Sequence, residues 1–147
     1  MARIGGSLLL AILWACLLTS SNSWCYFNKF STANDVFEAS YSPDGQYIVV
    51  AINDKRNYVY ETATYSAVFT YTLPTGWICF TAKFSPDQNF LAYGLQNSTV
   101  MIFDGNFNYV TKFGTAFQVS YEVHFSPNSD KLLVCGGNGG GSSVYGY

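Results

Sequence analysis

The chain has 147 residues, enough for one ordinary domain, and it is 49% hydrophobic, 18% aromatic and only 11% charged. A chain this apolar is not intrinsically disordered. Its formal charge of −2 includes no basic run, so the electrostatic footprint of a nucleic-acid-binding protein is missing and no nucleic-acid partner is expected.

The N-terminal segment 1–23 is predicted to be a signal peptide. One positive charge, Arg3, precedes the apolar run 7–18, and small polar residues follow over 19–23, as a cleavage region requires. The apolar run is shorter than the roughly 20 residues that a membrane-spanning helix needs. We therefore expect a secreted protein that meets the membrane only for targeting, with an uncleaved signal anchor as the alternative.

Export would place the remaining cysteines in an oxidising compartment. Cys25, Cys79 and Cys135 stay in the mature chain, and the sequence has neither a Cys-x-x-Cys pair nor a Cys/His ligand spacing. No metal and no cofactor are therefore expected. Two states remain open for the thiols, namely buried free cysteines or one disulfide with one thiol left over.

The segment after the signal consists of short strand candidates separated by polar turns. The run 37–41 alternates apolar and polar residues, whereas 47–51 is apolar throughout and indicates a strand buried on both faces. The strands predicted in this part of the chain are 26–30, 37–41, 47–51, 58–61 and 65–71.

The same order of strands follows in the rest of the chain. The predicted strands are 78–84, 90–94, 99–104 and 107–113, and then 121–125, 132–135 and 143–147. Since no helical periodicity occurs outside the signal and the strands are short and regularly spaced, the fold class is all-β.

One four-residue turn occurs three times and organises these strands. Its copies start at Ser42, Ser85 and Ser126, which are 43 and 41 residues apart. Proline fixes φ for the second position of a type I turn, and glycine at the fourth position tolerates positive φ, so the later copies, which lack that glycine, should fit less easily. The repeat turn residues are Ser42, Pro43, Asp44, Gly45, Ser85, Pro86, Asp87, Ser126, Pro127 and Asn128.

The second copy carries a family resemblance. Phe84-Ser85-Pro86-Asp87, then Phe90–Gly94 and then Thr99–Asp104 resemble the blade pattern of WD-repeat β-propellers. Phe103-Asp104 stands where that family has its Trp-Asp pair, and Tyr60-Glu61 is the counterpart in the first copy. The sequence departs from the family in having no Gly-His pair and no Trp at these positions.

The resemblance covers roughly residues 26–147 and implies β-propeller-type blades of four antiparallel strands. With the signal at 1–23, the region 24–147 would hold three WD-like repeats, at about 26–61, 65–104 and 107–147. Propellers have four to eight blades, so three repeats imply an open arc or part of a larger ring.

An open arc leaves a strand edge that another chain can pair with. The segment 27–30 matches 109–113, so the first predicted strand is similar to one that follows a third strand elsewhere in the chain. We expect self-association into a dimer or higher assembly, with 26–30 of one chain pairing with 144–147 of the other. The alternative is an N-terminal fragment of a longer propeller.

Catalytic motifs are not found in the sequence. It has no Gly-x-Ser-x-Gly elbow, and the single histidine, His124, lies in a predicted strand. Asp44, Asp87 and Asp130 lie near turns, where we expect them to stabilise the turn; with Glu122 they would be the acidic candidates if the protein were an enzyme. We expect no enzyme activity.

Two further motifs concern loops. The glycine-rich run 136–141 lacks the Lys-Ser/Thr of a phosphate loop and is predicted to be a flexible hairpin loop. Asn97-Ser98-Thr99 is an N-glycosylation sequon in a loop predicted to be exposed, which makes Asn97 the glycosylation candidate.

The sequence has 12 Tyr and 12 Phe, more aromatic side chains than a small core needs. A surplus on the surface would bind protein or, as a weaker expectation, a glycan. The sequence therefore predicts a secreted, non-enzymatic protein-binding or assembly module, with a secreted propeller hydrolase or a carbohydrate-binding protein as the alternatives.

Overall fold

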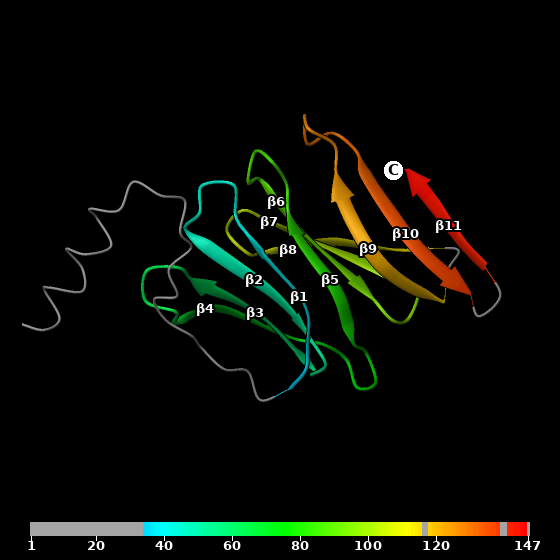
Figure 1. Cartoon of the computed structure of the whole chain (residues 1–147), viewed down its shortest axis with the longest axis horizontal. Coiled ribbons are helices and arrows are strands. Elements are labelled where there is room, and N and C mark those ends of the chain that lie inside the picture. The colour runs from blue at the N-terminus through cyan, green and yellow to red at the C-terminus, as the bar shows by residue number, and fades with distance from the viewer. Residues whose placement is uncertain (1–33, 116–117, 139–140, 147) are drawn as a thin grey trace, which may run out of the picture. The chain divides into compact units, whose positions relative to one another are not determined.

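A computed structural model describes residues 34–115, 118–138 and 141–146, and every regular element in these ranges is a β-strand. The strands form three antiparallel sheets that follow one another along the chain (Figure 1). The all-β prediction is therefore confirmed. The signal segment, Cys25 and the predicted strand 26–30 lie outside the described residues.

Each of the first two sheets consists of four strands in chain order. The first sheet contains β1 (Val36–Tyr41), β2 (Tyr47–Ile52), β3 (Arg56–Glu61) and β4 (Ala67–Thr72). The second contains β5 (Cys79–Phe84), β6 (Phe90–Leu95), β7 (Thr99–Asp104) and β8 (Tyr109–Gly114). The third has the order β11-β10-β9, from β9 (Val119–Phe125), β10 (Leu132–Asn138) and β11 (Gly141–Gly146).

Several predicted boundaries differ from the structure, and three of the differences have a clear physical or pairing basis. The strands predicted to begin at Tyr65 and Phe107 begin two residues later, because both residues have positive φ (56° and 65°) and lie in tight turns. The glycine-rich loop is also shorter than predicted, since Gly136 and Gly137 belong to β10, where they pair with Ser120 and Val119 of β9.

The three Ser-Pro turns have the same backbone geometry. The amide of the fourth residue donates to the serine carbonyl at 2.9 Å in every copy, from Gly45, Gln88 and Ser129. All three residues have positive φ, at 72°, 61° and 61°. The two non-glycine residues also contact the neighbouring turn. The side-chain amide nitrogen of Gln88 faces the Asp44 carboxylate at 3.0 Å, and Ser129 Oγ accepts a hydrogen bond from the backbone amide of Asp87 at 3.1 Å.

The sheets pack face to face, with the second sheet in the middle. Leu91, Tyr93 and Leu95 of β6 are fully buried in a cluster that includes Val49 and Val59 of the first sheet. Ala92 of β6 lies in a second cluster, whose members are Ala92, Val100, Val123, Leu132 and Val134. The apolar run of β6 is thus buried on both faces, as predicted for its counterpart 47–51 in the first copy, and each large aliphatic side chain buried there contributes about 2 kcal/mol.

Phe103 lies at the centre of an aromatic cluster. It is 1% exposed, and its ring centroid is 4.9 to 5.9 Å from four other rings, those of Phe69, Tyr71, Tyr93 and Tyr109. Asp104, the next residue, accepts hydrogen bonds from the backbone amides of Asn106 and Asn108 at 2.9 and 2.8 Å. The Phe-Asp pair therefore anchors β7 by ring packing and fixes the turn into β8.

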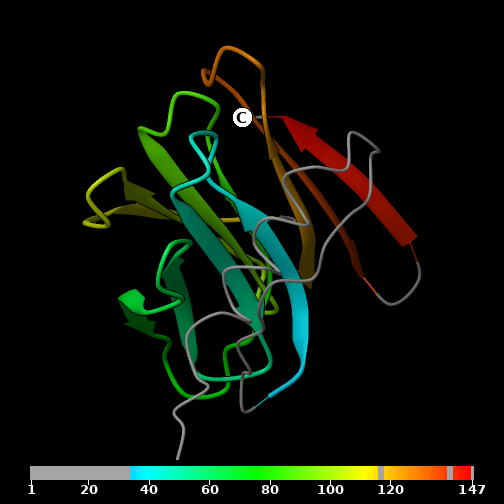
Figure 2. The same cartoon turned by 60° about the vertical axis from the view of Figure 1, so that its left-hand side comes forward.

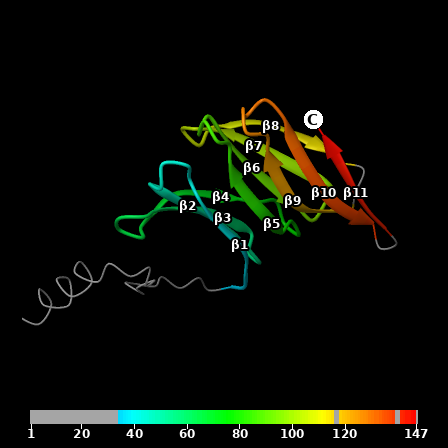
Figure 3. The ribbon, with the colours of Figure 1, turned by 45° about the horizontal axis from the view of Figure 1, so that its top comes forward.

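The first strands of the three sheets, β1, β5 and β9, lie side by side with β5 in the middle (Figure 2). The other strands of each sheet extend away from this line in order, so that β11 is the outermost described strand of the third sheet (Figure 3). Residues from three separate parts of the sequence therefore meet along β1, β5 and β9.

Candidate protein-binding surface

Each of the strands β1, β5 and β9 has a bulge five residues before its turn serine. The register of pairing skips Phe37 in β1, Phe80 in β5 and Tyr121 in β9. A bulge bends the strand locally and changes the direction of the extra side chain. Because all three bulged residues are aromatic, the fold produces one row of rings, which we call the aromatic row (Phe37, Phe80 and Tyr121).

The rings of the aromatic row are in contact across all three sheets. The Phe37 and Phe80 centroids are 4.7 Å apart, and those of Phe80 and Tyr121 are 5.9 Å apart in an edge-on arrangement. Phe37 is 43% exposed and Tyr121 is 55% exposed. Exposed aromatic side chains held in a rigid cluster are typical of protein interfaces, where Tyr and Phe are enriched.

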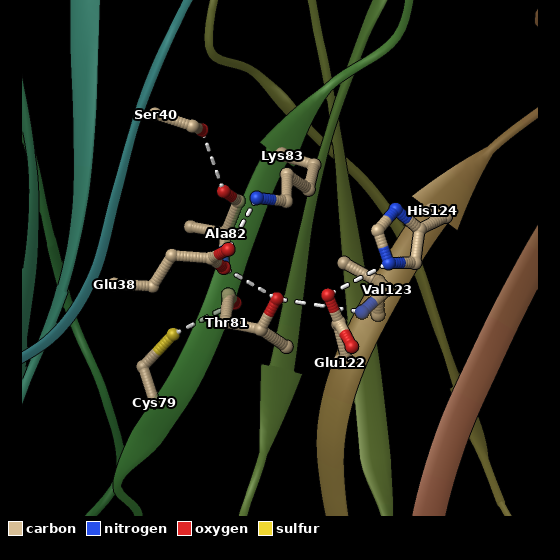
Figure 4. Close-up of polar contacts among 9 residues, drawn as sticks. All are labelled: Glu38, Ser40, Cys79, Thr81, Ala82, Lys83, Glu122, Val123 and His124. Atoms are coloured by element: carbon tan, nitrogen blue, oxygen red, sulfur yellow. Dashed lines mark hydrogen bonds and ion pairs between the residues drawn. The ribbon is translucent and has the colours of Figure 1, made fainter.

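A polar network joins the same three strands (Figure 4), and its residues Glu38 and Thr81 are the sequence neighbours of Phe37 and Phe80. Glu38 of β1 accepts hydrogen bonds from Thr81 Oγ1 at 2.7 Å and from the Ala82 amide at 3.0 Å, and it forms an ion pair with Lys83. The Val123 amide of β9 donates to Thr81 Oγ1 at 3.4 Å. Thr81 therefore connects all three sheets.

The environment of Glu38 favours its charged form. Burial of the carboxylate acts to raise its pKa, but the hydrogen bonds from Lys83, Thr81 and the Ala82 amide, together with the Lys83 charge, outweigh burial and lower the pKa. The carboxylate side chain is 21% exposed and that of Lys83 is 25% exposed. This partly buried pair holds β1 against β5 and so fixes the spacing of Phe37 and Phe80.

The acidic and histidine candidates from the sequence do not assemble into one catalytic site. Asp44 and Asp87 lie in the turns after β1 and β5, whereas Glu122 lies within β9 with a carboxylate oxygen 2.7 Å from His124 Nε2 (Figure 4). The two aspartates accept hydrogen bonds from Ser42 and Ser85 at 2.6 Å, and these bonds lower the pKa of both carboxyl groups.

The third turn uses a different carboxylate. Asn128 occupies the place of the aspartate, and Ser126 Oγ donates instead to Asp130 at 2.9 Å. The Lys131 amide donates to Ser126 Oγ at 3.0 Å, as the Tyr47 and Phe90 amides do to the serines of the other copies. Pro43 and Pro86 directly precede the aspartates of their turns, whereas Pro127 precedes Asn128.

Cys79 and Cys135 are free thiols, so they do not form a disulfide with each other. Burial raises the pKa of the Cys79 thiol, which donates to the Thr81 carbonyl at 3.3 Å, and an un-ionised buried thiol is not a nucleophile. Within residues 34–115, 118–138 and 141–146, no group of three or more His, Cys, Asp or Glu side chains could hold a metal ion.

Asn97 lies in the tight turn between β6 and β7, and it is partly exposed. Its side-chain oxygen is buried, and Thr99 Oγ1 donates to the Asn97 backbone carbonyl at 3.2 Å.

In the part of the chain that the structure describes, no helix is long and apolar enough to cross a membrane.

Reasoning from the sequence missed the aromatic row and its support. The pattern was visible in the sequence, since an aromatic residue occurs five positions before every turn serine. Strand alternation alone, however, does not reveal a bulge. Glu38, Thr81 and Lys83 were also missed, because their pairing depends on which strands become neighbours.

No protein-family model matches the sequence, and no curated protein matches it. Solved structures do match: the chain is similar to the WD40 repeats of RRP9, with a TM-score of 0.66 and 12% identity over 72% of this chain and 34% of that one. It is equally similar to U3-55K, with a TM-score of 0.66 and 13% identity over the same shares.

The three sheets are therefore WD-repeat-like β-propeller blades, two with four strands and one with three described strands, and within the described residues they do not close into a ring. The chain spans about a third of the length of these matched structures, since the match covers 34% of each of them.

Proposed function

We propose that this chain is a secreted, non-enzymatic protein-binding module that also assembles with itself. The observation that carries the proposal is the aromatic row, because it places two exposed rings and a third between them on three neighbouring strands of the fold. The similarity to WD40-repeat structures supports the same reading at the level of the fold.

The binding surface is tested with a displayed peptide library and the double variant Phe37→Ser/Tyr121→Ser. We expect peptides selected on the wild type to bind the variant at least about tenfold more weakly, since aromatic anchors of interfaces contribute about 2 kcal/mol or more each. The matched control is Val68→Ser/Val110→Ser, which removes side chains that are 47% and 49% exposed on β4 and β8.

Loss of binding in the control as well as in the aromatic variant would contradict the assignment of the surface. Binding of a glycan array instead of peptides, with the same dependence on Phe37 and Tyr121, would replace protein by carbohydrate as the partner.

A panel of glycosidase, esterase and phosphatase substrates should show no turnover, and turnover lost on changing Asp44, Asp87 or Glu122 would overturn the non-enzymatic assignment.

The proposal of secretion is supported by the apolar run 7–18 and the small polar residues after it. We expect N-terminal sequencing of exported material to begin between Asn22 and Trp24. Intact Met1 in a membrane pellet would show a signal anchor instead.

For an exported chain made in a eukaryote, we propose a glycan on Asn97, and Asn97→Gln should then remove a mass shift that glycosidase treatment also removes.

Self-association is supported by the outward face of the third sheet. Leu133 is 41% exposed there, whereas Val49 and Ala92, which also lie seven residues after their turn serines, are fully buried by the next sheet. A cavity of about 310 Å³ lies beside it, lined by His124, Phe125, Ser126, Lys131, Leu132 and Leu133. A face of this kind is stabilised when another sheet covers it.

A further inference from the structure

A cleft of about 270 Å³ lies at the end of the first two sheets where β1 and β5 begin (Figure 1). One wall is the turn between β2 and β3, and the other is the linker from β4 to β5. The lining residues are Asn53, Asp54, Lys55, Gly76, Trp77 and Ile78.

The cleft adjoins the aromatic row through both of its walls. The Asn53 amide donates at 2.8 Å to the carbonyl of Asp35, which lies two residues before Phe37. On the other wall, Ile78 lies two residues before Phe80. A partner that covers the aromatic row therefore also reaches the cleft.

Backbone hydrogen bonds hold the two walls in place. The Trp77 amide donates to the Pro74 carbonyl at 3.1 Å, and Gly76 has a φ of 85°, as in a type II turn with glycine at its third position. The Leu73 amide donates to the Lys55 carbonyl and so connects this turn to the turn between β2 and β3. A site that is formed before its ligand arrives loses less conformational entropy on binding.

Positive charge gathers around the cleft. Of the seven basic residues in the whole chain, three are found here. Lys55 lines the cleft, Arg56 follows it in the sequence, and Lys112 Nζ lies 5.3 Å from the centroid of the Trp77 ring. An ammonium group at this distance from an indole ring makes a cation–π contact.

The acidic residues near the cleft do not balance these charges. The Asp54 carboxylate accepts a hydrogen bond from the Lys55 backbone amide at 2.6 Å and pairs with Arg56 at 3.4 Å. Within the described residues, neither Lys55 nor Lys112 has an ion-pair partner. Even with Asp35 counted, three positive side chains meet two negative ones here, in a chain whose formal charge is −2.

We propose that the cleft binds a carboxylate side chain of the protein partner. The partner segment is then acidic where it meets Lys55, Lys112 and the Trp77 ring, and apolar where it meets the aromatic row. Charge complementarity of this kind selects one partner over others and is screened less inside a cleft than on an open surface. This inference rests on the proposed binding function and specifies the chemistry of the partner.

The test is a titration of the exported protein, labelled with ¹⁵N, with two probe peptides. One is acetyl-Gly-Phe-Glu-Glu-Phe-Gly-amide, and the other has Gln in place of both Glu residues. The indole N–H signal of Trp77, assigned with Trp77→Phe, reports the cleft directly. We expect the acidic peptide to bind about three- to tenfold more tightly, as for a charged contact at a partly exposed site, and the difference to shrink as salt is raised from about 50 to about 500 mM.

Lysine variants assign the preference to the cleft. Lys55→Gln and Lys112→Gln should each remove most of the preference for the acidic peptide and leave the affinity for the Gln peptide within about twofold. Lys131→Gln is the matched control, because it removes the same charge from a residue that precedes β10 and does not line the cleft.

Equal affinity for the two peptides, or an equal loss of preference in Lys131→Gln, would overturn the inference. A Trp77 signal that moves with maltotriose and with neither peptide would replace the carboxylate by a neutral sugar. If the acidic preference is absent while binding still depends on Phe37 and Tyr121, only the cleft is rejected. If no peptide binds at all, the proposed function is rejected with it.

Discussion

Individual side chains of β1, β5 and β9 hold the candidate surface together. Thr81 accepts from Val123 and donates to Glu38, so one hydroxyl joins three sheets, and Glu38 also pairs with Lys83. Removing a partly buried hydrogen-bonded group costs about 1–3 kcal/mol, mostly because its partners lose their bonds. At the scale of residues, the aromatic row therefore depends on polar contacts behind it.

The pKa of Glu38 leads to a prediction about pH. Because the folded-state pKa is lowered, the carboxylate contributes stability above the unfolded-state pKa, and this contribution is lost as pH falls through the folded-state value. We expect the difference in unfolding free energy between wild type and Glu38→Gln, measured in urea from about pH 7 to about pH 3, to shrink toward acid. A difference that stays constant over this range would contradict the assignment.

Gly94 leads to a prediction about packing. A Cβ at Gly94 would lie 2.5 Å from Thr81 Cγ2 and 3.1 Å from the Ser120 carbonyl oxygen, both in strands that cannot separate freely. Gly94→Ala should therefore lower the unfolding free energy by about 1–3 kcal/mol. Gly114→Ala is the matched control, because its nearest atom is 3.8 Å away, and an equal loss in both variants would refute the steric explanation.

At the scale of elements, the Ser-Pro turns join neighbouring sheets as well as neighbouring strands. Gln88 and Ser129 adopt the same positive φ as Gly45, and each makes a contact to the adjacent turn that glycine could not make. The less favourable backbone of the later turns is thus accompanied by a link between sheets.

Gly45 is the position where the cost of positive φ can be measured alone. No atom lies within 4 Å of the Cβ that an alanine would add, so Gly45→Ala changes only the backbone preference. We expect a loss of about 1 kcal/mol in unfolding free energy, and a smaller loss for Gly45→Asn, since Asn tolerates the left-handed region better. Equal stability of all three proteins in thermal unfolding would show that the turn relaxes to another conformation.

At the scale of the whole molecule, the packing of the sheets leaves one face and one edge of the third sheet available. Leu133 is exposed on this face, and β11 has a free edge within the described ranges. Apolar surface and unpaired strand edges both favour association.

Light scattering on the mature protein should therefore give a dimer or a larger assembly, with a thermal unfolding midpoint that rises with protein concentration. Deleting 25–30 should shift the protein to smaller species and lower that midpoint by several degrees. A cooperative monomer whose midpoint is independent of concentration would rule out the assembly.

The sequence by itself determined the all-β class, the three Ser-Pro turns and the doubly buried strand of β6. These features are local: proline fixes φ, alternation or continuity of apolar residues reports which faces of a strand are buried, and a repeated motif repeats its structure. The wrong boundaries predicted from the sequence at Tyr65 and Phe107 were local as well. Both side chains favour β-structure, but the left-handed backbone at these residues makes each strand begin two residues later.

Only the tertiary structure decided the candidate surface. Glu38 and Thr81 are 43 residues apart in the chain, and the contact between them exists because β1 and β5 become the adjacent first strands of neighbouring sheets. Phe37, Phe80 and Tyr121 become one row for the same reason, and because a bulge redirects each ring. Strand periodicity shows which residues share a face, but the order in which the sheets pack sets which faces and edges meet.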